Sequence, residues 1–308
     1  MEINYYRDIL DNLHEGIYLL DTNRIITLWN HGAELITGFK CSEVMGRPCS
    51  EDILIDAGNQ GLILCKEQCP MKQTLQDGQC RKLEAYLQHK EGYRLPVRLK
   101  IFPIKDESGS IVGVAETFTD ISPKVLLPQK TRELARMGLL DPLTKLGNRA
   151  YIELHLRSRL REMKQYRLPF GVMMFEIDTL QEISDNYGRE AGKQLRHMVT
   201  QTILNNIRFF DIIGRWDGDR YLLIILNIDE PKLDLVANKL RLLVAQSHAM
   251  ISSKLQSTTI SLGATIVEEQ DTVETLVSRV SELLAYSQKG GRNRVTLHLP
   301  SFTIPEKD

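Results

Sequence analysis

The first 120 residues contain short apolar runs separated by turn residues, a pattern typical of an antiparallel sheet with helices inserted in it. Five runs predict strands, at residues 16–21, 24–30, 81–89, 94–105 and 111–119. The turns between them contain Asn23, Gly92 and Gly109, which favour chain reversal. Residues 4–14, and the segment between the second and third strands, have the apolar spacing of short helices. This half therefore predicts an α+β fold, with helices covering one face of a five-stranded sheet and a pocket beneath them.

In the second half, apolar runs alternate with helical periodicities. Strands are expected at 170–178, 212–216, 220–226, 256–267 and 294–299, and helices at about 148–165, 188–207, 231–248 and 272–288. Asp217-Gly218-Asp219 stands between two apolar strands, and Asp-Gly in that setting is a strong signal for a hairpin turn. The order predicts a sheet with helices packed on its faces, similar to nucleotide cyclase and polymerase palm domains.

The two patterns meet near residue 122, where Ser122-Pro123 ends the last strand of the first half. We expect a sensor-like domain at residues 1–122, a helical linker at 123–140, a second domain at 141–300 and a tail at 301–308. Leu134, Met137 and Leu140 give the linker an amphipathic stretch. Two interpretations are open: a short coiled coil that transmits motion between paired subunits, and a plain tether.

Composition narrows the functional classes. The 308 residues hold 39 Lys plus Arg against 40 Asp plus Glu, a balance that excludes nucleic-acid binding through bulk positive charge. No apolar run approaches the roughly 20 residues that span a bilayer, so no membrane partner is expected. The start, Met1 to Asn4, lacks the basic and apolar regions of a secretory signal, and the expected location is the cytoplasm.

The first half resembles the PAS fold. The matching residues are Gly16-Ile17, the segment from Trp29 to Phe39, Gly46 and the run Phe118-Thr119-Asp120-Ile121. The resemblance covers about residues 3–122 and implies a sensor domain. Because PAS domains bind haem, flavin, small metabolites or nothing, the fold does not name the ligand.

All five cysteines lie in the first 80 residues, and an odd number argues against a disulfide framework. Cys65 and Cys69 have i, i+4 spacing and, with Cys49, form one constellation. Three interpretations are open: buried apolar thiols, a soft metal or iron–sulfur cluster, and a redox pair. Further candidate ligands are Cys41, Cys80 and His89 for a metal, and His31 and His89 for haem.

The second half resembles the GGDEF family, over about residues 138–300. The motifs are Asp141-Pro142-Leu143-Thr144-Lys145-Leu146-Gly147-Asn148-Arg149, Asp185-Asn186-Tyr187-Gly188, Ala191-Gly192, Ser261-Leu262-Gly263 and Gly291-Arg292-Asn293-Arg294. The resemblance implies a pair of domains, each holding one GTP, that together form cyclic di-GMP, so a homodimer is expected. Metal ions neutralise the phosphates in such chemistry. Glu176 and Asp219 are the candidate Mg²⁺ ligands if nucleotide is bound; the alternative interpretation is that both are solvated carboxylates at the ends of their elements.

The hairpin departs from the Gly-Gly-Asp/Glu-Glu-Phe motif of the family. It is Asp217-Gly218-Asp219-Arg220-Tyr221. Asp217 replaces a glycine and adds negative charge near the phosphates, and Arg220 replaces the acid implicated in catalysis. Glu176 replaces the metal-binding aspartate. The guanine-contacting Asn and Asp correspond to Ser184 and Lys193, and the phosphate-contacting lysines to Gln181 and Gln288; Asp219 and Arg292 match the family. These changes imply a domain that does not make cyclic di-GMP.

Arg208-Phe209-Phe210-Asp211 matches the R-x-x-D motif with which the family binds cyclic di-GMP as an inhibitor. A guanidinium binds phosphate or a guanine edge, and a carboxylate accepts from guanine N–H groups. The alternative interpretations are an exposed ion pair between Arg208 and Asp211 and a turn cap made by Asp211.

Three functions are compatible with the sequence. The favoured one is a cytoplasmic signalling protein, with a PAS input domain coupled to an inactive GGDEF domain that acts as a cyclic di-GMP receptor or as a scaffold for a partner protein. The second is an active diguanylate cyclase. The third is a domain of altered nucleotide choice, or one that binds GTP only to regulate a partner.

Overall fold

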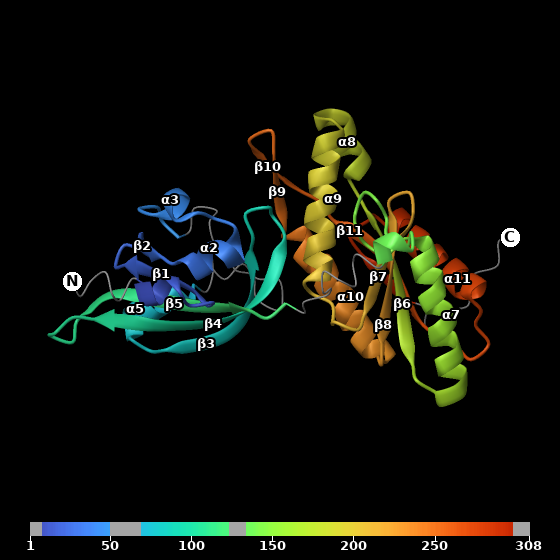
Figure 1. Ribbon diagram of the computed structural model, residues 1–308, viewed down its shortest axis with the longest axis horizontal. Helices are drawn as coiled ribbons and strands as arrows, with labels where there is room; N and C mark the ends of the chain where they lie inside the picture. The colour runs from blue at the N-terminus through green and yellow to red at the C-terminus, as the bar shows by residue number, and fades with distance from the viewer. Residues whose placement is uncertain (1–7, 50–68, 123–133, 298–308) are drawn as a thin grey trace. The chain divides into compact units, whose positions relative to one another are not determined.

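The computed structural model describes residues 8–49, 69–122 and 134–297 (Figure 1). The chain divides into two compact units, one built on residues 1–122 and the other on most of residues 123–308. Within the described ranges, none of the helices combines the length and the apolar character that a membrane crossing requires.

The N-terminal unit is a five-stranded antiparallel sheet with short helices, as predicted. Its strands are β1 (Gly16–Asp21), β2 (Ile26–Trp29), β3 (Arg81–Gln88), β4 (Arg94–Lys105) and β5 (Ile111–Asp120), in the spatial order β2-β1-β5-β4-β3. Its helices include α2 (His31–Thr37), α3 (Cys41–Val44) and α5 (Pro70–Asp77). Each neighbouring pair of strands is antiparallel, so the predicted fold class of this half is confirmed.

An aromatic cluster lies in the core of this unit. The ring centroids of Trp29 lie 5.6 Å from Tyr18 and 6.5 Å from Phe118, and the three side chains are almost fully buried. Asn30, 2% exposed, begins α2 by accepting a hydrogen bond from the backbone N–H of Ala33 at 2.8 Å. The same oxygen accepts from the backbone N–H of Ile17 at 2.8 Å, which ties the start of α2 to β1.

The C-terminal unit is a five-stranded sheet flanked by helices. Its strands are β6 (Phe170–Ile177), β7 (Ile212–Asp217), β8 (Arg220–Leu226), β11 (Ile260–Ile266) and β12 (Val295–Leu297), in the order β12-β11-β6-β8-β7. Its helices are α7 (Arg149–Tyr166), α8 (Leu180–Tyr187), α9 (Arg189–Leu204), α10 (Glu230–Ala245) and α11 (Val273–Lys289). The strands pair antiparallel except β11 and β12, which are parallel.

The two faces of this sheet are covered by different helices (Figure 1). Val172 and Met174 of β6 belong to one core with α7 and α11, and Trp216 of β7 lies in the same core. The helices α9 and α10 cover the other face, toward which the alternate residues of each strand point. This alternation sets the face of each strand side chain except between Arg215 and Asp217 of β7, where a register shift interrupts it.

The sequence pattern differs from the structure in two places. The helix expected at 188–207 is α9, but the pattern missed the short helix α8 before it, and Gly188, where φ is +87°, separates the two helices. A residue without a side chain permits this left-handed break, and the new helix α9 begins directly after it. The expected strand at 256–267 is divided between β10 (Lys254–Ser257) and β11, and β10 pairs instead with β9 (His248–Ile251), which the sequence pattern did not indicate.

Parts of the predicted linker and termini lie outside the described residues. These parts are residues 123–133 of the linker, residues 4–7 of the first helix and the tail at 301–308. Of the described linker, residues 134–136 form a single helical turn, and Gly138 follows with φ of +66°. The helical conformation therefore ends before the second domain begins.

Candidate functional site

The tip of the β7–β8 hairpin is held by an ion pair between Asp217 and Arg220. The two residues are register partners across the turn. Arg220 donates from Nε to Asp217 Oδ1 at 2.6 Å and from Nη2 to Oδ2 at 2.7 Å. Gly218 occupies the turn with φ of +46°. The guanidinium at the fourth motif position is therefore neutralised within the motif, by the carboxylate at the first.

Asp219 is held by two guanidinium groups. Arg196 of α9 donates from Nη2 to Asp219 Oδ1 at 2.7 Å. Arg215 of β7 places Nη2 3.7 Å from the same oxygen. Arg215 is itself fixed, because its Nε donates to the carbonyl oxygen of Gly218 at 2.7 Å and its Nη1 to Asp141 Oδ2 at 3.2 Å. Asp219 and Asp141 thus share Arg215.

Asp141 connects this network to the turn that precedes α7. One of its oxygens accepts from both the backbone N–H and the hydroxyl of Thr144, each at 2.8 Å. Burial by itself would raise the pKa of this carboxyl, but the bonds from Thr144 and the Arg215 guanidinium outweigh it and lower the pKa. Asp141 is therefore a structural carboxylate that anchors Arg215.

Glu176 and Asp219 have different neighbours. Glu176 is the register partner of Arg220 on the neighbouring strand, so these side chains share the face that α7 and α11 cover. The carboxylate of Asp219 instead bonds to Arg196 of α9, on the other face. Among the described residues, no three His, Cys, Asp or Glu side chains converge so as to hold a metal ion. Because a divalent cation requires several oxygen ligands, the side chains of Glu176 and Asp219 do not by themselves make a complete site.

Tyr221, the last residue of the motif, is fully buried and stacks on Phe175 of β6, with ring centroids 4.8 Å apart. Burial raises its pKa to about 12. Its hydroxyl group has no hydrogen-bond partner in the described part of the chain. The ring is therefore a core side chain behind the hairpin, on the face that α9 covers.

The substituted nucleotide positions make local bonds. Ser184 donates its hydroxyl to the carbonyl oxygen of Leu180 at 2.8 Å, within its own helix. Lys193 pairs with Glu190 at 2.9 Å. Arg292 is exposed, with φ of +62° in the turn before β12. The structure therefore places these three predicted residues in one domain, with Ser184 on α8, Lys193 on α9 and Arg292 in the turn before β12.

Asp178, one residue beyond β6, is a structural residue that the sequence analysis did not single out. It accepts from the hydroxyls of Thr259 at 2.5 Å and Ser261 at 2.6 Å, and from the backbone N–H of Asn293 at 3.2 Å. It therefore fixes the end of β6, the start of β11 and the turn that carries Arg292. Its position two residues after Glu176, at a predicted strand end, was the available signal.

The R-x-x-D motif forms the turn between α9 and β7. Asp211, 6% exposed, accepts from the backbone N–H of Arg208 at 2.9 Å and of Leu226 at 3.1 Å. Arg208 is exposed and lies over the ring of Phe210, 5.8 Å from its centroid. Within the described residues the two charged side chains form no ion pair. The turn-cap interpretation thus describes the carboxylate of Asp211, while the guanidinium of Arg208 is accessible.

The turn borders a pocket of about 270 Å³. Phe209, Phe210 and Asp211 line it from the turn, and Tyr151, His155 and Arg159 line it from α7. Phe209 is 61% exposed and Phe210 is 52% exposed. Aromatic rings, a basic side chain and an accessible guanidinium therefore gather at this end of α7.

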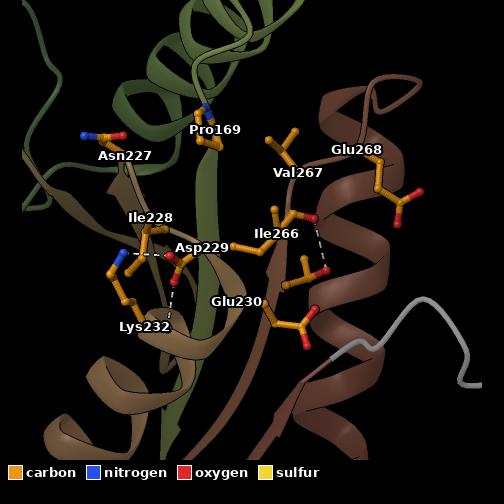
Figure 2. A pocket seen from close by; sticks show the side chains of 10 residues that line it. Pro169, Asn227, Ile228, Asp229, Glu230, Lys232, Ile266, Val267 and Glu268 are labelled. Carbon is orange, nitrogen blue, oxygen red and sulfur yellow. Dashed lines mark hydrogen bonds and ion pairs between the residues drawn. The ribbon is translucent and has the colours of Figure 1, made fainter.

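A larger pocket, of about 470 Å³, lies at the end of the sheet opposite the hairpin. Figure 2 shows Pro169, Ile228, Ile266 and Val267 around it, with Asp229 turned toward Lys232. Pro169 precedes β6, Ile228 follows β8, and Ile266 and Val267 lie at the end of β11. This pocket is therefore separate from the hairpin and holds none of the predicted site residues.

The cysteines do not form a described cluster. Cys49 is buried in the core of the N-terminal unit, and Cys41 and Cys69 pack against that core. Cys80 is exposed, and Cys65 lies outside the described residues. The haem candidates also have local contacts, because His89 stacks on Tyr93 and His31 lies 3.6 Å from Glu34. The interpretations of the cysteines stay predictions.

Two family models match the chain. The PAS domain model matches residues 14–123, and the model described as "Diguanylate cyclase, GGDEF domain" matches residues 139–294, half of the chain. The chain belongs to the GGDEF family. Both resemblances inferred from the motifs are confirmed.

The relatives of this PAS–GGDEF chain include named cyclases. "Probable diguanylate cyclase DgcE" of Escherichia coli (strain K12) is 24% identical over 298 residues, covering 94% of this chain and 26% of that protein. Diguanylate cyclase DosC of the same strain is 25% identical over 174 residues, covering 56% of this chain and 38% of that protein. The chain thus spans well under half of either relative.

Solved GGDEF domains share the fold of the C-terminal unit. The coiled coil and GGDEF domain of DgcB from Caulobacter crescentus, in complex with c-di-GMP, gives a TM-score of 0.52 at 21% identity, over 55% of this chain and 91% of that one. Diguanylate cyclase SiaD of Pseudomonas aeruginosa, in complex with its activator SiaC, gives 0.51 at 22% identity, over 55% and 67%. In the GGDEF domain of this chain, therefore, the fold is that of the family, while the hairpin carries its own set of ion pairs.

Proposed function

We propose that this chain is a signalling protein in which a PAS sensor domain regulates a GGDEF domain that does not form cyclic di-GMP and that instead binds cyclic di-GMP as a receptor. The bidentate pair between Arg220 and Asp217 carries the first part of the proposal. The receptor part is supported by the accessible Arg208 and the aromatic residues next to it.

The charge arrangement at the hairpin is unsuited to the cyclase reaction. That reaction requires attack of a ribose 3′-hydroxyl on an α-phosphate, with metal ions to neutralise the phosphates and an acidic group at the hairpin. Here the fourth motif position is a guanidinium bound at 2.6 Å and 2.7 Å to a carboxylate that replaces a glycine. The motif therefore offers neither an acid at that position nor an open turn.

The turn at 208–211 offers groups that suit a cyclic dinucleotide. A guanidinium binds phosphate or a guanine edge in a bidentate manner, and exposed aromatic rings stack on bases. Arg208 supplies the first, and Phe209 and Phe210 supply the second. Asp211 accepts two backbone N–H groups, so in this proposal it holds the turn in shape while Arg208 contacts the ligand.

Titration of the full chain with cyclic di-GMP tests the receptor part. Arg208→Ala should abolish binding, and Arg189→Ala, which removes an exposed arginine from the start of α9, should leave it unchanged. Circular dichroism of each variant checks that the fold is intact. Equal affinity of wild type and Arg208→Ala, or no binding by wild type, would contradict the receptor proposal.

Product analysis with GTP and Mg²⁺ tests the inactive part, and the expected result is no cyclic di-GMP even at high protein concentration. The second candidate function, an active cyclase, is favoured by Asp219 and Arg292, which keep the family identity. Cyclic di-GMP formed by wild type and lost in Asp219→Asn would establish the second candidate and contradict our proposal. GTP binding without product would point to a regulatory nucleotide site.

The PAS domain and the assembly state need their own measurements. Metal analysis and an absorption spectrum of protein purified without oxygen distinguish a haem, an iron–sulfur cluster or another metal from inert thiols. We further propose that the chain acts as a homodimer in the cytoplasm and relays its signal to a partner protein. Light scattering of the full chain tests the dimer.

A further inference from the structure

The carboxylate of Asp219 has a positively charged partner from α9. Arg196 donates to it at 2.7 Å, and the Arg196 side chain is 13% exposed while that of Asp219 is 35% exposed. The neighbours of Arg196 on α9, Leu195, Met198 and Val199, are fully buried. Because these anchors fix the helix against the sheet, the guanidinium is held beneath the hairpin before any ligand arrives.

A second guanidinium completes the charge around Asp219. Arg215 lies 3.7 Å from the oxygen that Arg196 contacts, and Asp141 and the carbonyl oxygen of Gly218 hold Arg215 in place. Two guanidinium groups carry the same formal charge as one divalent cation. A metal ion that approached Asp219 would meet this charge at short range, where repulsion in a partly buried site is strong.

Burial of the Arg196 guanidinium is energetically unfavourable, which also indicates that its bond to Asp219 is the reason for its position. Its Nε is buried and has no hydrogen-bond partner within the described residues. A buried donor without a partner is unfavourable, so burial of the guanidinium does not by itself stabilise the fold. The bond to Asp219 is the contact that this side chain makes at the hairpin.

We propose that Arg196 is a resident cation that takes the place of a metal ion at Asp219, so that the hairpin of this GGDEF domain is charge-neutralised without a divalent metal. Arg196 is in this sense a specificity-determining residue, since it selects against the cation that its carboxylate would otherwise bind. The inference concerns the hairpin alone and does not depend on cyclic di-GMP binding at Arg208.

Titration of the full chain with Mn²⁺, followed by electron paramagnetic resonance of the free ion, tests this proposal. Wild type and Asp219→Asn should bind Mn²⁺ equally. Arg196→Leu should bind Mn²⁺ at least about tenfold more tightly than wild type, because the variant lacks a full positive charge a few Å from the Asp219 carboxylate. The added Asp219→Asn change should remove the gained site.

Two controls match this design. Arg189→Leu removes a positive charge from the exposed start of the same helix, and it should bind Mn²⁺ like wild type. Arg196→Lys keeps the charge and should also gain no site. Mn²⁺ binding by wild type that Asp219→Asn abolishes would overturn the proposal, and this comparison does not require Arg196→Leu to fold. A folded Arg196→Leu that gains no site would overturn it as well.

Discussion

Arg220 and Asp217 face each other at paired positions of β7 and β8, and each nitrogen of the guanidinium edge meets one oxygen of the carboxylate, at 2.6 Å and 2.7 Å. Both residues depart from the family motif. In this bidentate pair the two charges neutralise each other. The two substitutions are thus physically coupled, and they should be changed together in any attempt to restore the motif.

The strength of this pair can be measured with a double-mutant cycle. Because the two side chains are 39% and 38% exposed, solvent screens their attraction, and the coupling energy of Asp217→Asn with Arg220→Gln should be about 0.2–1 kcal/mol. Urea unfolding followed by circular dichroism gives the values. The exposed pair Asp229 and Lys232 serves as a reference and should give a similar coupling. A coupling above about 2 kcal/mol would show that the pair behaves as a buried one.

Asp178 should contribute strongly to the stability of the GGDEF domain, because it accepts three hydrogen bonds that connect separate elements. Asp178→Ala removes a charged acceptor from two hydroxyls and one backbone N–H, and it should lower the free energy of unfolding by about 2–3 kcal/mol. Asp178→Asn keeps one carbonyl acceptor and should lose less. Asp185→Ala changes an exposed residue of α8 and should fall within about 0.5 kcal/mol of wild type. Equal stability of Asp178→Ala and wild type would refute this role.

Asp211 should give the chain a specific pH dependence. Burial raises the pKa of its carboxyl above the ordinary 3.8, against the opposing effect of the backbone bonds from Arg208 and Leu226. Because the folded state then binds the proton more tightly, this contribution to stability is complete below pH 3.8 and is lost as the pH rises through the folded-state pKa.

The free energy of unfolding of wild type, relative to Asp211→Asn, should therefore fall as the pH is raised above 3.8. Urea unfolding at a series of pH values measures the difference, and the comparison cancels the other carboxyl groups. A difference that rises with pH would mean that the hydrogen bonds outweigh burial.

Gly263 of β11 is packed against α11. A Cβ at this position would lie 2.4 Å from the backbone N of Leu284 and 2.4 Å from the carbonyl oxygen of Val280. Backbone atoms cannot rotate away, so Gly263→Ala should push α11 off the sheet and cost about 1–3 kcal/mol of unfolding free energy. Thermal unfolding measures it. An unchanged midpoint would show that the helix moves freely.

The sequence pattern predicted the strands around the hairpin because Asp-Gly between two apolar runs favours few alternatives. It also placed Glu176 at a strand end and Arg220 at the start of the next strand. It could not give their register, which puts them side by side and turns Asp219 toward the other face. Register depends on side-chain packing between strands that are distant along the chain.

The contact between Arg196 and Asp219 was beyond sequence analysis for a related reason. Helical periodicity places Arg196 on a helix, but a long side chain reaches either solvent or a buried partner, and only the packing of α9 on the sheet decides which. Asp211 was different, because the motif allowed both a ligand contact and a turn cap. The geometry gives its carboxylate the second role, since both oxygens accept backbone N–H groups.

The chain's two tryptophans are divided between the domains. Trp29 lies in the aromatic core of the PAS domain, and Trp216 lies in the GGDEF core with the Arg149 guanidinium 4.7 Å from its ring. Tryptophan fluorescence therefore comes from one emitter in each domain. In a Trp29→Phe chain, a change of tryptophan emission when the stimulus binds the PAS domain would report directly that the GGDEF domain has responded.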